Sequence, residues 1–493
     1  MSRRPSLAVH LRSAFHLLAL VLQWLGLAFL IPLVAALVYG EPGWPWILTL
    51  AITSALGLVL RWLTREAEEV RVREAFLVVS LSWLLLAALG SLPYLLLGAL
   101  GPVDAFFESM SGFTTTGATV LLDIEGQPRS LLLWRALSQW LGGMGIIVLA
   151  IAILPKLAVG GRPLMEAEVP GLEVERLTPR IRETARALWK VYVGLSAAEL
   201  LLLMLVGLAP FEALAHTFTT LSTGGFGTRA DSLASFPVAA QWLVVLFILL
   251  GGTNFALLYR ALRRPLRGVG TLWRDEEFRF YLAVFALITG LLFLDLRGIY
   301  GSVEAALRHS AFQVASIMTT TGYASADFDR WDSPAKLLLL ALMFLGGSAG
   351  STGGSIKLVR TLLIFKVLIR EVRRVLHPQA VIPIRLGSRV IDEEALRGVT
   401  AFAILYVTLF ALGSIVFLLD LERVGMEVPV LDAVSAVAAA LGNVGPGFGI
   451  VGPMASYAPL PETSKLLLMF LMWIGRLEIF PVLVLLTRDY WRG

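Results

Sequence analysis

Apolar runs long enough to cross a bilayer recur along this chain from one end to the other. The hydrocarbon core offers the backbone no water, so a crossing segment must satisfy its own hydrogen bonds as a helix. Only 16% of the 493 residues are charged and 57% are hydrophobic, which is unusual for a soluble domain. We therefore predict an all-α polytopic membrane protein. The expected spans are 13–39, 45–63, 74–99, 131–157, 184–209, 237–260, 278–296, 334–365, 396–420 and 463–487.

Positive charges follow a pattern that predicts the orientation of these spans. They cluster at 61–73, 156–190, 260–279 and 357–397, and the segments between carry few. By the positive-inside rule the basic loops and both termini are expected in the cytoplasm. The N-terminal apolar run is too long for a signal peptide and is expected to stay as a first helix. The absence of cysteine excludes disulfides and thiolate metal sites.

Four of the poorly charged outer segments share one design. Each runs from a short stretch of small and apolar residues into a hydroxyl or amide side chain and then a glycine, as in FFESMSGFTTTGAT. The glycines in register are Gly117, Gly225, Gly322 and Gly445, separated by 108, 97 and 123 residues. About 25 to 30 residues after each comes a second glycine site, in LGGMG, LGGTN, LGGSAG and WIGRL. The chain therefore contains an imperfect four-fold repeat of span, short helix, polar loop and span.

The physics of this repeat favours a pore. The short helices cannot cross the hydrocarbon region, and irregular backbone at that depth is tolerated only inside protein or beside a water-filled cavity. Four such loops around one axis would offer backbone carbonyls, and the negative ends of the helix dipoles would favour a cation. Because the loops carry no carboxylate, a monovalent cation is expected. The alternative is that these are helix-packing motifs of small residues, which are common in membranes.

We expect five parts in the chain. An N-terminal transmembrane hairpin covers 1–68, and pore repeats follow at 69–160, 161–265, 266–375 and 376–493.

These motifs resemble the Trk/Ktr/HKT superfamily of potassium transporters, and most closely its TrkH-type members. The resemblance implies four span–pore-helix–span repeats around a central pore, plus an N-terminal two-helix hairpin. It also implies that one glycine in each repeat belongs to a selectivity filter with K⁺ as the permeant ion. The expected filter residues are Thr115, Thr116, Gly117, Thr223, Gly224, Gly225, Thr320, Thr321, Gly322, Asn443, Val444 and Gly445.

Two features inside the pore spans add to this prediction. The segment 346–355 holds five glycines in nine residues, which makes a continuous helix unfavourable. The resemblance implies that it is an intramembrane gating loop beneath the filter. Arg476 interrupts the last span, where the equivalent sites in the first three repeats are taken to be Met144, Thr253 and Ser348. We expect Arg476 to face the permeation path, although pairing with Glu478 is the simpler alternative. The expected gate residues are Gly346, Gly347, Ser348, Gly350, Thr352, Gly353 and Gly354.

The resemblance further implies partners and a location. It predicts a cytosolic TrkA-type nucleotide-binding ring that controls the gate, a homodimer in membrane lipid, and a place in the bacterial cytoplasmic (inner) membrane. It predicts no organic cofactor in this chain and no enzymatic activity. A secondary transporter that couples K⁺ to H⁺ or Na⁺ is the alternative, with Glu199 as a candidate proton-coupling group or, equally, a packing residue. An intramembrane enzyme ranks last, because the sequence contains no catalytic constellation.

Overall fold

The computed structural model describes residues 11–65, 72–152, 177–263 and 268–492. Within these ranges the chain is mostly helical, and the only strands are β1 (Arg385–Leu386) and β2 (Arg389–Val390), an antiparallel pair of two residues each. The predicted all-α class is confirmed.

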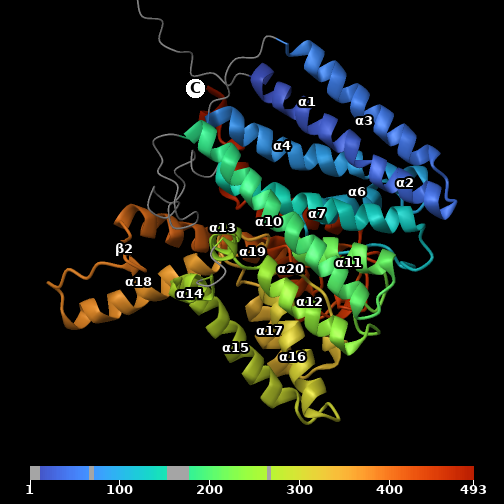
Figure 1. Ribbon diagram of the computed structural model, residues 1–493. Helices are drawn as coiled ribbons and strands as arrows, with labels where there is room; N and C mark the ends of the chain where they lie inside the picture. The colour runs from blue at the N-terminus through green and yellow to red at the C-terminus, as the bar shows by residue number, and fades with distance from the viewer. Residues whose placement is uncertain (1–10, 66–71, 153–176, 264–267, 493) are drawn as a thin grey trace, which may run out of the picture.

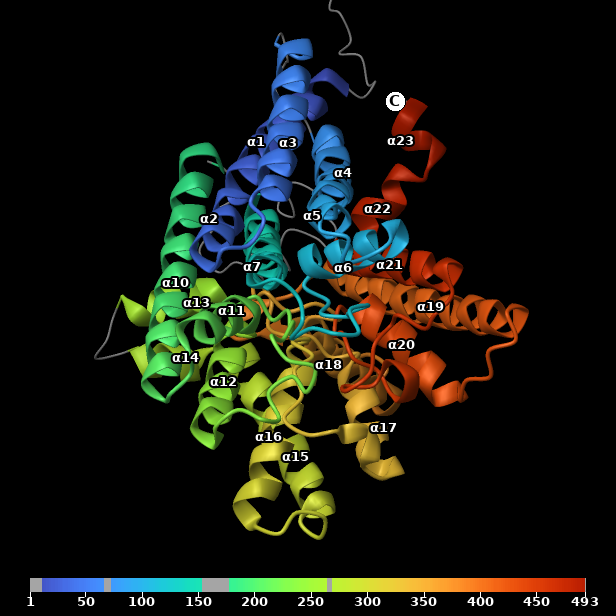
Figure 2. The same cartoon turned by 90° about the vertical axis from the view of Figure 1, so that its right-hand side faces the viewer.

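The N-terminal hairpin consists of α1 (Leu11–Ala28), α2 (Leu30–Tyr39) and α3 (Trp44–Leu63). Small residues allow α1 and α3 to pack closely, since a Cβ added at Gly57 would lie 3.2 Å from the carbonyl oxygen of Ala19. The hairpin lies outside the four repeats, against the first of them (Figure 2). This is the arrangement that the sequence predicts.

The four repeats follow one another around a common centre, which is clearest in Figure 2. Each has an outer helix, a short helix that ends near the centre, and a second long segment. The first repeat comprises α4 (Val72–Gly90), α5 (Leu92–Leu96), α6 (Pro102–Phe113) and α7 (Arg129–Ala152). The second comprises α10 (Leu177–Leu205), α11 (Pro210–Leu221), α12 (Val238–Gly251) and α13 (Phe255–Leu262), followed by the short connecting helix α14 (Gly268–Arg274). The third comprises α15 (Glu276–Leu296), α16 (Val303–Met318), η1 (Phe328–Arg330), α17 (Ser333–Leu342) and α18 (Leu358–Leu376). The fourth comprises α19 (Glu393–Arg423), α20 (Val430–Gly442), η2 (Gly449–Val451), α21 (Glu462–Arg476), α22 (Phe480–Leu485) and α23 (Arg488–Arg492).

Fewer helices qualify as simple membrane spans than the ten that the sequence predicts. Among the described residues, six are long and apolar enough, and α12 with α13 makes a seventh if this pair, bent by 103°, counts as one span. The other three expected spans correspond to α7, to α17 with α18, and to α21 with α22. The break between α17 and α18 contains the predicted glycine site, whereas α21 continues through Gly475 and breaks just after it, where Glu478 and Ile479 have positive φ.

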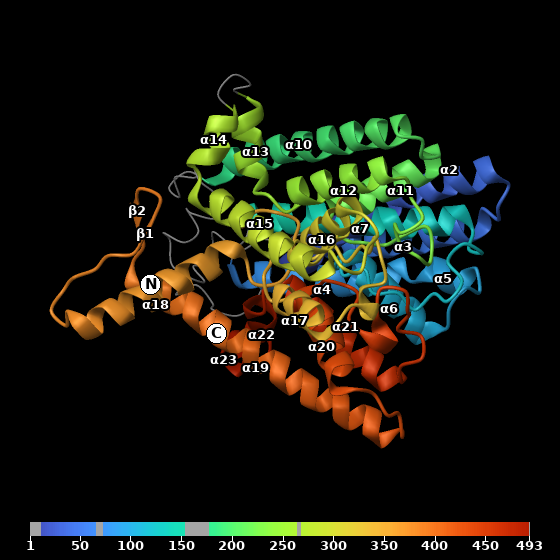
Figure 3. The same cartoon turned by 90° about the horizontal axis from the view of Figure 1, so that it is seen from below.

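The proposed part boundaries remain predictions. The boundaries at 68/69, 160/161 and 265/266 lie outside the described residues. The one at 375/376 lies in the last turn of α18. Helix α18 and the β1–β2 hairpin extend from the end of the molecule opposite to the turn between α2 and α3 (Figures 1 and 3).

Candidate functional site

Four short helices, α6, α11, α16 and α20, end close to the common centre of the repeats. They have 12, 12, 16 and 13 residues. At 1.5 Å per residue they are about 18 to 24 Å long, less than the roughly 30 Å of a hydrocarbon core. Proline begins two of them, at Pro102 and Pro210, where its missing N–H carries no penalty. They are the short helices that the sequence predicts.

Each of these helices ends in the same strained turn. In α6, the N–H of Thr115 donates to Gly112 O at 3.0 Å and the N–H of Thr116 donates to Ser111 O at 2.9 Å. This is the Schellman pattern, in which the first residue after the cap takes a left-handed conformation. That residue is usually glycine, but three of the four here are threonines, whose branched side chain makes positive φ costly. The φ angles are 52° at Thr115, 52° at Thr223, 61° at Thr320 and 55° at Asn443.

Two residues beyond each strained position lies the glycine that the repeat brings into register. These glycines also have positive φ, of 82°, 79°, 81° and 103° from the first repeat to the fourth. A Cβ added to any of them would collide with the carbonyl oxygen of the residue before the glycine of the next repeat. Around the ring, Gly117 meets Gly224 O, Gly225 meets Thr321 O, Gly322 meets Val444 O and Gly445 meets Thr116 O. The four segments therefore form a closed ring in the order of the chain.

The four segments are not chemically equal. The Tyr457 hydroxyl donates to Gly445 O at 2.6 Å, and Gln139 Nε2 donates to Gly224 O at 2.7 Å. Asn443 Nδ2 donates to Thr116 Oγ1 at 3.0 Å, which ties the fourth repeat to the first. Protein donors therefore engage two of the backbone oxygens of the expected filter.

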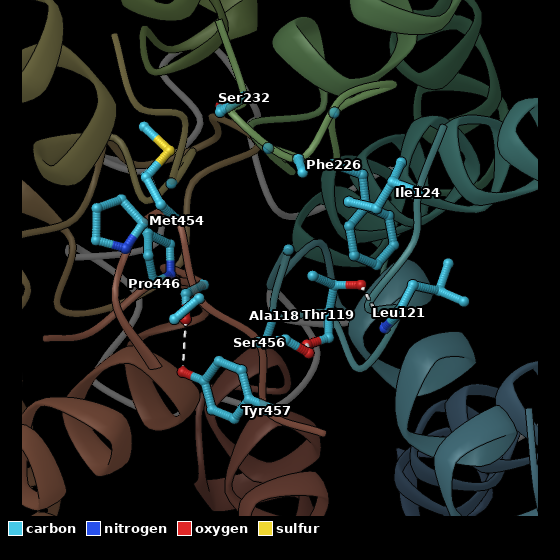
Figure 4. A pocket seen from close by; sticks show the side chains of 18 of the residues that line it. Ala118, Thr119, Leu121, Ile124, Phe226, Ser232, Pro446, Met454, Ser456 and Tyr457 are labelled. Atoms are coloured by element: carbon cyan, nitrogen blue, oxygen red, sulfur yellow. Dashed lines mark hydrogen bonds between the residues drawn. The ribbon is translucent and has the colours of Figure 1, made fainter. Parts of the chain in front are cut away.

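A cavity of about 200 Å³ lies over the ring. All four glycines line it, together with Ala118, Phe226 and Pro446, and Tyr457 lies in its wall close to Pro446 (Figure 4). Beside it lies a buried ion pair, in which Arg135 Nε is 2.8 Å from Glu108 Oε1. Arg135 also donates to Gly227 O at 3.0 Å, so this pair joins the first repeat to the second.

The second glycine register has a packing role. In the first two repeats, the first glycine of the LGG pair lies against the end of the short helix of its own repeat, as a Cβ at Gly251 would lie 3.1 Å from Leu221 O, whereas Gly346 of the third repeat lies against Gly354 O of its own loop. The second glycine of these two repeats lies against the next repeat, as a Cβ at Gly252 would lie 2.6 Å from Thr319 Cγ2, whereas Gly347 lies against Ser351 and Gly252 O. Side chains at these positions would push the long segments away from the ring.

This packing corrects the sequence register of Arg476. Gly475 lies against Leu441 O, as Gly142 lies against Phe113 O, so Gly475 corresponds to the first glycine of the pair. Arg476 therefore aligns with the second glycine, Gly143 in the first repeat, and not with Met144, Thr253 and Ser348. WIGRL contains a single glycine, which is why sequence alone misplaces it by one residue.

The segment between α17 and α18 is a non-helical loop, as the glycines predict. It is packed beneath the ring, and residues 346–357 are buried apart from the half-buried Gly350. Thr352 Oγ1 donates to Leu221 O at 3.0 Å and to Gly251 O at 3.1 Å, both in the second repeat. Gly354 N donates to Thr320 Oγ1 at 2.7 Å, in the third. The loop thus binds the inner side of the expected filter segments.

Arg476 is buried, with 2% of its surface exposed, and reaches this loop. Its Nη1 donates to Thr352 O at 2.8 Å and its Nη2 donates to Gly142 O at 3.2 Å. The side chain therefore bridges the loop and the first repeat. The direct ion pair of Glu478 is with Arg360, since Glu478 Oε2 lies 2.6 Å from Arg360 Nη2.

Two aspartates lie near the starts of short helices. Asp104 and Asp432 are in the first turns of α6 and α20, but neither caps its helix through the side chain. Asp104 instead lies 2.6 Å from Lys465 Nζ. Burial, with the nearby Asp329 carboxylate, raises the pKa of Asp432 above its usual value. Among the described residues no three histidine, aspartate or glutamate side chains form a metal cluster.

Gln139 and Tyr457 are two residues of the site that the sequence motifs do not predict. Both reach the expected filter from other segments, and neither belongs to the repeated motif. Only a glutamine inside an apolar span could have drawn attention to Gln139. Glu199 is fully buried in α10, the outer helix of the second repeat.

Comparisons with known proteins agree on one family. The family model TrkH, described as "Cation transport protein", matches residues 46–491. "Trk system potassium uptake protein TrkH" from Halomonas elongata is 40% identical over 491 residues, covering 98% of this chain and 99% of that protein. The protein of the same description from Escherichia coli strain K12 is 39% identical over 492 residues, with coverage of 98% and 100%.

A solved structure is similar over the whole chain. It is described as the crystal structure of the potassium transporter TrkH from Vibrio parahaemolyticus. The TM-score is 0.90 and the identity 36%, with 98% of this chain and 100% of that one covered.

Proposed function

Because this chain belongs to the TrkH family of cation transport proteins, we propose that it is the membrane subunit of a potassium uptake system. The relatives are named as transport proteins, so this is a transporter family and not a family of enzymes. The chain carries K⁺ as its permeant ion through the centre of the four repeats.

The ring of four glycine segments is the filter. The observation that carries this proposal is the closed contact of each glycine with a carbonyl of the next repeat, under a cavity that all four glycines line. Carbonyl oxygens replace the hydration shell of a cation at such a ring. The twelve predicted filter residues supply these oxygens, although those of Gly224 and Gly445 also accept protein hydrogen bonds. Fewer equivalent oxygens imply weaker discrimination of K⁺ from Na⁺ than in a four-fold symmetric channel.

The buried loop at 346–355 is the gate. It is bonded to the inner side of the second and third repeats, so an ion that leaves the ring meets it directly. Arg476 holds it through Thr352 O and places a positive charge beneath the filter. A glycine-rich segment with a few breakable hydrogen bonds can exchange between two arrangements.

The remaining parts of the proposal concern setting and partners. The basic loops and both termini face the cytoplasm, and the protein lies in the bacterial inner membrane as a homodimer. Its gate is controlled by a cytosolic nucleotide-binding ring that docks on the basic inner loops. The relatives are named as proteins of a Trk system, which supports further components.

Flux into liposomes tests the proposal. Purified protein is reconstituted, and K⁺ and Na⁺ uptake are measured with and without Gly322→Ser. We expect K⁺-preferring flux that follows the electrochemical gradient and loses its preference in the variant. A requirement for a proton gradient, with no effect of Gly322→Ser, would overturn the filter and favour a coupled transporter. Glu199, buried and ionisable, would then be the first residue to replace.

A further inference from the structure

Gln139 is a polar side chain buried behind the ring. It lies on α7 of the first repeat, and none of its surface is exposed. Both polar atoms of its amide form hydrogen bonds with the backbone of the second repeat. Nε2 donates to Gly224 O at 2.7 Å, and Oε1 accepts from Phe226 N at 3.1 Å. The amide therefore spans the backbone on both sides of Gly225, the ring glycine of that repeat.

The second repeat is also the one in which the residue before the ring glycine has no side chain. This residue is Thr116, Thr321 and Val444 in the other three repeats, and each of these is β-branched. A Cβ added at Gly224 would lie 2.8 Å from Gln139 Nε2 and closer still to Cδ and Oε1. The glutamine amide thus occupies the space that a branched side chain fills elsewhere.

The position of Gln139 is apolar in the other repeats. Three residues before the first glycine of the pair come Ile248, Met343 and Met472, and all three are fully buried. Met343 and Val444 belong to the same buried apolar cluster. At three junctions between neighbouring repeats the two positions hold an apolar and a branched residue, and at the junction of the first and second repeats they hold glutamine and glycine.

We propose that Gln139 is a positioning residue for ion selectivity, which sets the orientation of the Gly224 carbonyl and of the second filter segment. This inference rests on the proposed function of the ring. Without a side chain, Gly224 has more backbone freedom than its three counterparts, and two hydrogen bonds from a rigidly packed amide remove that freedom. The hydrogen bond from Gln139 Nε2 is accepted by Gly224 O, which is also the oxygen that faces Gly117 in the ring. It therefore makes the second repeat a weaker ligand than the third.

Two variants test the inference by the ratio of K⁺ to Na⁺ flux in liposomes. Gln139→Met keeps a similar volume but removes both hydrogen bonds, and it copies the residue of the third and fourth repeats. We expect the flux ratio to fall at least fivefold while the folded yield and the total cation flux persist. The double change Gln139→Met with Gly224→Val gives the second repeat the pairing of Met343 with Val444. We expect it to restore the ratio to within about twofold of the original.

A purely structural role of Gln139 predicts a different result, namely a lower folded yield at an unchanged ratio, and this would overturn the inference. If Gln139→Met yields no folded protein, the double variant carries the test, and a folded double variant without selectivity would also overturn it. Gly322→Ser, measured in parallel, separates the two proposals. A ratio that responds to Gly322→Ser and not to Gln139→Met contradicts only the role of Gln139, whereas no response to either contradicts the filter itself.

Discussion

Gly445→Ala should displace a carbonyl group of the ring through a steric collision, and a control variant can separate this effect from the cost of backbone strain. The φ angle of Gly445 is 103°, so an L residue there carries a cost of roughly 1–3 kcal/mol. Its Cβ would also lie 2.6 Å from Thr116 O, where real Cβ contacts begin near 3.0 Å. The difference, 3.0 − 2.6, means that the Thr116 carbonyl must move by at least about 0.4 Å, close to the ~0.5 Å tolerance of a preorganised binding site.

Gly207 provides a matched control. Its φ is 100°, and a Cβ added there meets nothing within 4 Å, so Gly207→Ala carries the same strain without the collision. We expect both variants to lower thermal stability to a similar degree. Only Gly445→Ala should lower the ratio of K⁺ to Na⁺ flux, by about tenfold, which corresponds to about 1.4 kcal/mol of lost discrimination.

The assay is uptake of each cation into liposomes at equal gradients, with thermal unfolding of the same detergent-purified samples. The reasoning is refuted if Gly445→Ala and Gly207→Ala show the same flux ratio as the parent protein. An equal loss of selectivity in both variants would also refute the steric explanation, because backbone strain far from the ring would then be enough to lower the flux ratio.

The contacts of the loop and of the buried ion pair give further predictions. Replacing Arg476 with methionine removes the hydrogen bond to Thr352 O, so K⁺ flux in the absence of any partner should rise several-fold; an unchanged or lower flux would contradict the role of Arg476 in holding the loop. Glu108→Gln leaves the buried Arg135 without its counter-charge and should lower the free energy of unfolding by about 3–5 kcal/mol in denaturant titrations. Glu212→Gln breaks the more exposed pair of Glu212 with Arg229 and should lower the free energy of unfolding by less than about 1 kcal/mol. An equal loss of stability in the Glu108 and Glu212 variants would show that burial does not decide how much an ion pair contributes.

The sequence predicts the repeat and most of the elements because both depend on local properties. Apolar run length identifies the spans, and the spacing of Gly117, Gly225, Gly322 and Gly445 identifies the segments that meet. The glycines at 346–354 identify a break in a span, because glycine is unfavourable inside a helix. These features need no knowledge of what lies next to them in space.

The parts that escaped prediction depend on neighbours from distant segments. Nothing in the residue type indicates that Thr115 adopts positive φ, since threonine disfavours that conformation. Gln139 acquires its role only because α7 packs behind the second repeat. The register of Arg476 becomes clear only from the contact of Gly475 with Leu441 O.

The closed ring also limits when the protein can become functional during synthesis. The first three junctions join neighbouring repeats, but the last joins Gly445 to Thr116, and Asn443 bonds Thr116 Oγ1 across 327 residues of chain. The entropic cost of closing a loop grows only slowly with its length, but this contact requires that the first repeat wait, already inserted, until nearly the whole polypeptide has left the ribosome. A chain truncated before the fourth repeat can therefore insert its helices, but it holds only three of the four segments of the ring.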